Sequence, residues 1–125
     1  MTNLLWIAFG GALGAVSRYG LSRYFISSYG INAAPWATLA TNIIGSFLIG
    51  IAYVILVERQ QLPVHLTQAI TVGILGAFTT FSTFSLDIFH FISAGRYGLA
   101  LSYLVLSFIL GLTAVTLGII LARLS

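Results

Sequence analysis

The sequence predicts an all-α membrane protein with four transmembrane helices per chain, the third of them broken, assembled as an antiparallel homodimer. Three observations lead to this fold class. Hydrophobic residues make up 59% of the 125 residues and charged residues only 6%, with a mean hydropathy of +1.08. Most of the uncharged intervals are long enough to cross a hydrocarbon core of about 30 Å. The few charges are also shared almost evenly between the two sides of the predicted bundle.

Composition excludes several classes of protein. A soluble domain carries roughly a quarter charged residues, so the five arginines and two acidic residues here cannot form a water-exposed surface. The net charge of +3 does not indicate nucleic-acid binding, because the arginines are scattered singly along the chain. The chain has no cysteine, which excludes a disulfide scaffold and a cysteine nucleophile.

The charged residues and turn signals divide the chain into four apolar segments. We expect helices over about residues 4–25, 36–57, 66–92 and 98–122, forming a single transmembrane domain over residues 1–125. The first helix is expected to be retained, because no cationic residue precedes its apolar core as in a signal peptide. Pro35 suits the start of the second helix, where its missing N–H costs nothing.

The arginines give little preference for one orientation in the membrane. Four helices place both termini and the 58–65 loop on one side, with Arg59 and Arg123; Arg23 and Arg96 lie on the other side. Orientation follows the Arg and Lys bias of short loops, so this chain is predicted to insert both ways. Two opposite copies can then pair about a two-fold axis in the membrane plane as an antiparallel homodimer. Chance is the alternative explanation for so even a distribution.

Polar residues follow one face of the second and fourth helices. Thr38, Asn42 and Ser46 recur at steps of four residues, and an unpaired amide in hydrocarbon costs several kcal/mol, so Asn42 must face protein or water. It serves either as an interhelical hydrogen-bonding group or as part of a pore lining. Tyr103 and Ser107 repeat the pattern on the fourth helix, and hydroxyls can bind either a cation or an anion.

The third helix contains the most unusual segment. Gly73 and Gly76 precede a run of hydroxyl and aromatic side chains comprising Thr79, Thr80, Phe81, Ser82, Thr83, Phe84 and Ser85. The hydroxyls can bond back to their own helix and bend it. Alternatively, the helix is interrupted near residues 76–79 and its freed carbonyls meet a cation. The edges of Phe81 and Phe84 could solvate an anion, although their spacing alone favours ordinary packing.

The remaining charged residues suggest an electropositive pore mouth. Arg18 lies deeper in the first helix than the other arginines, and an arginine near a pore mouth favours anions. Asp87 and His90, three residues apart near a helix end, could be a proton relay or an interfacial carboxylate with a hydrogen-bond or arginine partner. No catalytic triad, metal-binding histidine cluster or phosphate loop occurs, so an enzyme is not predicted.

Several motifs together resemble a known family. Residues 10–19, Thr38 with Asn42, residues 45–47 and residues 73–85 resemble the Fluc (CrcB) family of fluoride channels, in order and over nearly the whole chain. The resemblance implies an antiparallel homodimer with two pores. These pores would pass fluoride out of the cytoplasm down its electrochemical gradient, across the bacterial plasma (inner) membrane.

The resemblance also implies which residues form the site. Fluoride would pass side chains that match the family's pore positions or the hydroxyl run: Asn42, Phe81, Phe84, Thr38, Ser82, Ser85, Tyr103 and Ser107. Arg18 would make the vestibule electropositive. A structural Na⁺ at the dimer centre would be held by the main-chain carbonyls of Gly76 and Thr79, four oxygens from two copies. Asp87 departs from the glutamate usual in the family, and its role stays open.

The main alternative is a small dual-topology exporter that exchanges protons for cationic compounds. That mechanism needs a carboxylate embedded in the membrane, and the first helix has none. Asp87 would have to serve alone. A purely structural membrane subunit is a third possibility, but it leaves Asn42, Phe81 and Phe84 without a purpose.

Overall fold

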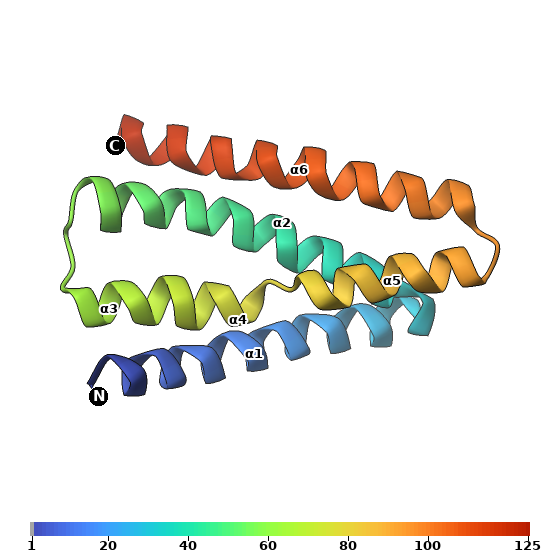
Figure 1. The fold of residues 1–125 in the computed structure, drawn as a ribbon, viewed down its shortest axis with the longest axis horizontal. Coiled ribbons are helices and arrows are strands. Elements are labelled where there is room, and N and C mark those ends of the chain that lie inside the picture. Colours follow the sequence, from blue (N-terminus) through green and yellow to red (C-terminus); the bar gives the residue numbers. More distant parts are fainter. Residues whose placement is uncertain (1) are drawn as a thin grey trace.

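The computed structural model describes residues 2–125, which form an antiparallel bundle of four long helical segments with no strand among them (Figure 1). In chain order the elements are α1 (Thr2–Tyr29), η1 (Ile31–Ala33), α2 (Ala34–Ala52), η2 (Tyr53–Glu58), α3 (Val64–Gln68), η3 (Ala69–Leu75), α4 (Gly76–Phe78), α5 (Phe81–Ser93) and α6 (Tyr97–Leu124). The segments Thr2–Tyr29, Ile31–Glu58, Val64–Ser93 and Tyr97–Leu124 are each long and apolar enough to cross a membrane. The predicted set of four membrane-capable helices is therefore confirmed.

The two termini lie at one end of the bundle, beside the connection between η2 and α3 (Figure 1). The other two connections lie at the opposite end. Each helical segment extends a few residues beyond its predicted bounds, because a helix continues into the interfacial region as long as its backbone hydrogen bonds are satisfied. Gly30 and Gly95 end two of the helices with positive φ angles of 94° and 77°, a conformation that favours glycine.

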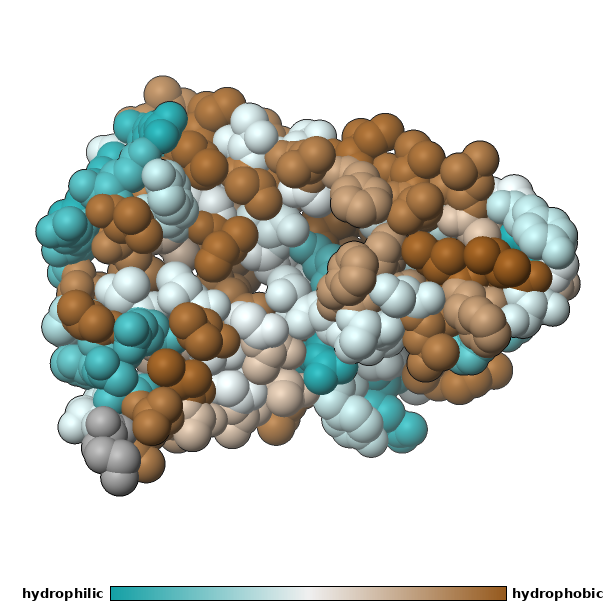
Figure 2. All heavy atoms as spheres, in the orientation of Figure 1, coloured by the Kyte–Doolittle hydropathy of each residue, from teal (hydrophilic) through white to brown (hydrophobic). Residues whose placement is uncertain are grey.

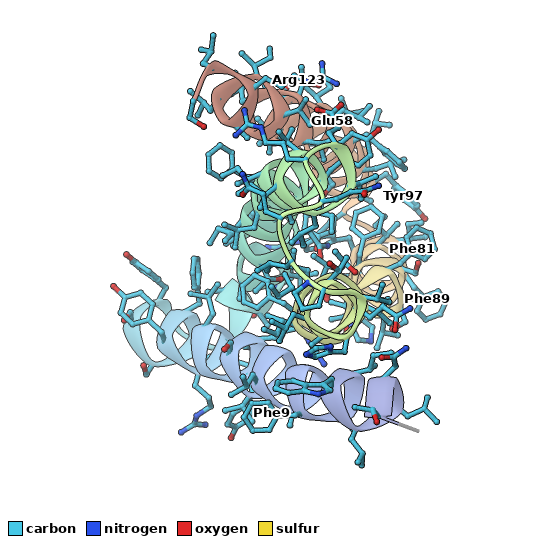
Figure 3. All side chains as sticks on the ribbon, turned by 90° about the vertical axis from the view of Figure 1, so that its left-hand side faces the viewer. Phe9, Glu58, Phe81, Phe89, Tyr97 and Arg123 are labelled. Atoms are coloured by element: carbon cyan, nitrogen blue, oxygen red, sulfur yellow. The ribbon has the colours of Figure 1, made fainter. Side chains whose placement is uncertain are left out.

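Hydrophobic side chains cover most of the surface. Figure 2 shows hydrophilic residues gathered at the end of the bundle that holds the termini. At that end, Arg123 Nε donates to Glu58 Oε1 at 3.1 Å, and Arg59 Nη2 donates to the carbonyl oxygen of Ala122 at 2.9 Å. Figure 3 places Glu58 and Arg123 side by side. These contacts tie the end of η2 to the end of α6.

Glycines allow the helices to approach closely, as small residues do in membrane bundles. A Cβ atom at Gly10 or Gly14 of α1 would overlap main-chain oxygens of η3, and one at Gly50 of α2 would overlap the Val115 oxygen of α6. Gly118 of α6 faces the main chain of α2 in the same way. The bundle therefore has two tight pairs, α1 with η3 and α2 with α6.

Two segments of the second and third helices are wound as π-helix, which the sequence analysis does not predict. η2 and η3 flank the same connection and pack together through Leu56 and Leu75. In η2 the wider winding is visible in the hydrogen bond from the Arg59 amide to the Val54 oxygen at 2.9 Å, five residues back. Such wide turns shift the carbonyls relative to an ordinary α-helix.

The third helix is broken, as one of the two interpretations predicts, but slightly later than expected. α4 ends at Phe78, Thr79 and Thr80 are extended with ψ angles of 156° and 122°, and α5 begins at Phe81 (Figure 1). The other interpretation, in which hydroxyls bond back to their own helix, also holds in part, because Ser85 Oγ donates to the Phe81 oxygen at 3.0 Å. The break lies near the middle of the bundle, where no lipid-facing loop could be tolerated.

Candidate ion pathway at the helix break

Asn42 of α2 holds the break in place. Its Nδ2 donates to the Thr80 carbonyl oxygen at 3.1 Å, and its Oδ1 accepts from the Thr80 amide at 2.9 Å. The side-chain amide therefore replaces the helical acceptor that the Thr80 amide loses where the helix is interrupted, and it adds a donor to the Thr80 carbonyl oxygen, which is the N-cap carbonyl of α5. Asn42 is half-buried, so this pairing satisfies the polar group that the sequence analysis expects to face protein or water.

The break redirects the amides that normally bond to the carbonyls of Gly76 and Thr79. In a continuous α-helix the Gly76 oxygen accepts from the Thr80 amide, which here donates to Asn42. The Thr79 oxygen would accept from the Thr83 amide, which here donates to Thr80 Oγ1 at 3.2 Å as the N-cap of α5. Both carbonyls thus lose their ordinary helical partner.

Arg18 of α1 stabilises the end of the first half-helix. Its Nε donates to the Ala77 oxygen at 3.1 Å. A cation at the carbonyl end of a helix is favourable, since the last carbonyls carry partial negative charge. Arg18 therefore contributes directly to the break, a contact that its position in the sequence does not indicate.

Several of the predicted site residues, from three helical segments, meet at one hollow of about 440 Å³. Asn42 and Ser46 come from α2, Gly76 and Thr79 from the break region, and Ser107 from α6. Phe81, Phe84 and Phe108 are the aromatic side chains in its wall. The Ser107 hydroxyl is buried and has no hydrogen-bond partner among the described residues, so its hydrogen-bonding capacity is unused.

The two predicted phenylalanines lie differently in this wall. Phe84 is buried, with 6% of its surface exposed, whereas Phe81 is 74% exposed. Their ring centroids lie 5.8 Å apart. Figure 3 places Phe81 on the outer side of α5, on the same side of the bundle as Phe89 and Tyr97. The hollow is therefore open toward the outside of the single chain.

A smaller polar pocket of about 200 Å³ lies on the α1 side of the break. Arg18 and Thr38 line it together with hydroxyl side chains that the sequence analysis does not assign to a site, namely Ser22, Thr41, Thr80 and Thr83. Thr80 lines both this pocket and the hollow. The break thus separates a polar, arginine-containing pocket from a largely apolar hollow.

The structure separates other predicted site residues from the hollow. Ser82 and Ser85 are exposed on α5, and neither lines the hollow or the pocket. Tyr103 is completely buried behind Phe84, and its hydroxyl donates to Asp87 Oδ2 at 2.9 Å. The partner of the Asp87 carboxylate is therefore a tyrosine hydroxyl and not an arginine. A hydrogen-bonded carboxylate is one of the alternatives that the sequence leaves open for Asp87.

Sequence reasoning missed the role of Thr80. The signal was available, because threonine is one of the residues preferred at a helix N-cap, where its hydroxyl accepts from the amide two or three residues later. Thr80 Oγ1 caps α5 and also donates to Thr83 Oγ1 at 3.2 Å. What the sequence could not show is that the main chain of Thr80 pairs with an amide thirty-eight residues away.

The fold and the hollow define an α-helical membrane protein with a polar break inside its bundle, an arrangement used by channels and transporters. A family model described as "CrcB-like protein, Camphor Resistance (CrcB)" matches residues 5–119. The chain belongs to this family. The resemblance seen in the sequence motifs is thereby confirmed.

Similar proteins cover the chain almost completely. A relative from Hahella chejuensis named fluoride-specific ion channel FluC is 47% identical over 122 residues, covering 98% of this chain and 95% of the relative. A relative of the same name from Magnetococcus marinus is 42% identical over 122 residues, covering 98% of both chains. These relatives are ion channels, which confirms that an enzyme is not the class to expect. The chain is a multi-pass integral membrane protein of bacteria.

Replacing Asn42 tests its role in holding the break. In Asn42→Ala the Thr80 amide loses its partner, at a cost of about 1–3 kcal/mol for a donor left buried, and the Thr80 oxygen loses one of its donors. Asn42→Asp should also fail, because a carboxylate accepts from the Thr80 amide but cannot donate to its oxygen. We expect both variants to lower the thermal unfolding midpoint of the purified protein, while Ser46→Ala on the same helix face, whose side chain holds no part of the break, leaves it nearly unchanged. An Asn42→Ala variant as stable as wild type would contradict this role.

Proposed function

We propose that this protein is a fluoride-selective channel that lowers cytoplasmic fluoride by passive, electrogenic export across the bacterial plasma (inner) membrane. The names and the near-complete coverage of its relatives support the transported ion. The observation that carries the proposal is the hollow at the break, where Ser107, Phe81 and Phe84 converge from two helices. No other arrangement among the described residues brings this many predicted site residues together.

The chemistry of the hollow suits a small anion that gives up part of its hydration. The free Ser107 hydroxyl can donate a hydrogen bond to an anion. The edges of the phenylalanine rings carry partial positive charge and can replace water without adding a full charge that would trap the ion. Arg18, in the adjoining pocket, raises the electrostatic potential for anions at the entrance.

The functional unit in this proposal is an antiparallel homodimer with two pores. A single chain leaves the hollow open and exposes Phe81, a large aromatic side chain that lines it. A second copy of opposite orientation would cover that side and supply the missing wall of each pore. The nearly even distribution of arginines between the two ends supports insertion in both orientations.

We further propose that a structural Na⁺ lies at the dimer centre. The carbonyls of Gly76 and Thr79 both lose their helical amide partner, and both residues line the hollow. Two copies would offer four oxygens, a ligand set that suits a hard cation.

The alternative of a proton-coupled exporter of cationic compounds has less support. Its mechanism needs a carboxylate that meets the substrate. Asp87 is the acidic residue available within a helix interior, and it lines neither the hollow nor the smaller pocket. Its oxygen is already engaged by the Tyr103 hydroxyl.

Ion efflux from liposomes tests the channel and its aromatic wall. With valinomycin present to relieve the voltage, we expect rapid fluoride efflux and negligible chloride efflux, read with ion-selective electrodes. Phe81→Ile and Phe84→Ile should each reduce fluoride efflux at least tenfold, because an aliphatic side chain has no positive ring edge.

Phe89→Ile is the matched control for these variants, since Phe89 lies on the same helix, is exposed and does not line the hollow. It should leave fluoride efflux unchanged. No fluoride efflux from verified wild-type dimers would overturn the proposed function. Unaltered efflux in both Phe81 and Phe84 variants would place the pathway elsewhere.

Diffraction with ion replacement tests the central cation. In crystals of the dimer we expect a monovalent cation on the two-fold axis, at bonding distance from the Gly76 and Thr79 oxygens of both copies. Its density should change when Na⁺ is exchanged for a heavier monovalent ion. An axis without density at a resolution that shows ordered water would count against the proposal.

Moving arginines between the two ends tests dual topology. Because the charge bias is nearly balanced, Arg23→Ala together with Arg96→Ala should make nearly all copies insert in one orientation. Reporter tags at the C-terminus read the orientation. Fluoride resistance should then fall and return when an oppositely biased copy, Arg59→Ala with Arg123→Ala, is expressed beside it. Full resistance from a single fixed orientation would contradict an antiparallel dimer.

A further inference from the structure

Asp87 has no part in the pathway described so far, yet the bundle holds it in a specific contact. It lies on α5, half-buried, and its Oδ2 accepts a hydrogen bond from the Tyr103 hydroxyl of α6 at 2.9 Å. The ion pair found among residues 2–125 joins Arg123 to Glu58 at the far end of the bundle. Within those residues, no arginine forms an ion pair with Asp87. Tyr103 is its hydrogen-bond partner at 2.9 Å, and the Thr38 hydroxyl of α2 is a second side chain within hydrogen-bonding reach.

Tyr103 is the most completely buried large side chain, with 0% of its surface exposed. Its ring stacks on Phe84 with centroids 5.3 Å apart and an angle of 28° between the ring planes. Phe91 contacts it edge-on at 5.5 Å, and Trp36 does so at 5.9 Å. The Tyr103 ring therefore cannot shift without disturbing Phe84.

Phe84 transmits this packing to the wall of the hollow. Besides its stack on Tyr103, its ring lies 5.8 Å from Phe81 and 6.3 Å from Phe108, and all three phenylalanines line the hollow. A continuous series of contacts thus leads from the Asp87 carboxylate through the Tyr103 ring to the aromatic wall.

We infer that Asp87 is a positioning residue: by accepting the Tyr103 hydroxyl, it fixes the ring against which Phe84 is held at the ion pathway. This inference rests on the proposed channel function and adds a residue to it. Asp87 itself does not meet the ion. It acts through Tyr103, whose hydroxyl is committed to the carboxylate.

Physical reasons favour this role over simple packing. Burial of the Tyr103 ring among apolar neighbours is a non-directional attraction, so it does not by itself fix the rotation of the ring. A hydrogen bond to a carboxylate is directional and stronger than one between neutral groups. Asp87 also lies three residues after Phe84, on the same side of α5, so the bond and the stack hold Tyr103 from one helix face. Together they define both the position and the rotation of the ring.

The test compares single-channel behaviour in liposomes that hold, on average, fewer than one dimer each. In this assay a folding defect lowers the fraction of liposomes that release fluoride, whereas a displaced pathway wall lowers the rate in those that do. Asp87→Ala and Tyr103→Phe should each lower the rate about tenfold, the effect of losing one charge-assisted hydrogen bond worth about 1.4 kcal/mol. Asp87→Asn keeps an acceptor oxygen and should retain most of the rate.

The double variant of Asp87→Ala with Tyr103→Phe decides whether the two groups act together. If Asp87 acts only through the Tyr103 hydroxyl, the double variant should be no slower than either single one. Glu58→Gln, the other acidic side chain, and Tyr97→Phe, an exposed tyrosine on α6, are matched controls that should keep the wild-type rate.

Three results would overturn the inference: a wild-type rate in Tyr103→Phe, an Asp87→Asn variant as slow as Asp87→Ala, or rate losses that multiply in the double variant. Should Asp87→Ala fail to assemble, Tyr103→Phe alone decides, because it removes the donor and keeps the ring. Absence of fluoride release by wild-type protein in the same liposomes would instead refute the proposed function, so the two failures are distinguishable.

Discussion

The hydrogen-bonded pair between the Asn42 side chain and the main chain of Thr80 is the interaction on which the rest of the structure depends. An interrupted helix inside a membrane leaves main-chain groups without partners, and no water is present in the hydrocarbon to satisfy them. One side-chain amide accepts from the Thr80 amide, which has lost its helical acceptor, and donates to the Thr80 oxygen at the same time. Without it, a continuous third helix would be favoured, and the break would close.

Everything near the centre of the bundle follows from that break. Redirecting the amides of Thr80 and Thr83 leaves the carbonyls of Gly76 and Thr79, two residues that line the hollow, without their helical partners, while Arg18 caps Ala77 on the α1 side. The start of α5 then presents Phe81 and Phe84 next to Ser107. Main-chain oxygens, a free hydroxyl and aromatic edges are thereby gathered within one hollow, although they come from three helical segments.

Much of this arrangement could be predicted, because membrane insertion depends on properties that are local in sequence. Apolar length predicted the four helices, and the glycine and hydroxyl run predicted the interruption of the third. For two of the predicted site residues, the structure shows surroundings that their spacing in the sequence did not indicate. Asn42 was expected to face a pore or a neighbouring helix, and its amide is used by the Thr80 main chain. Tyr103 was grouped with Ser107 by spacing, yet it is buried behind Phe84 and bonded to Asp87.

By itself, the sequence determined that this is a four-helix membrane protein, where its helices begin and end to within a few residues, and which polar side chains could not face lipid. The family motifs are also a property of the sequence. Only the tertiary structure decided which partner each polar group has. The contacts of Asn42 with Thr80, Arg18 with Ala77 and Asp87 with Tyr103 join different helices. Such pairings depend on the rotation and depth of each helix, and packing sets these through glycine contacts that hydropathy does not record.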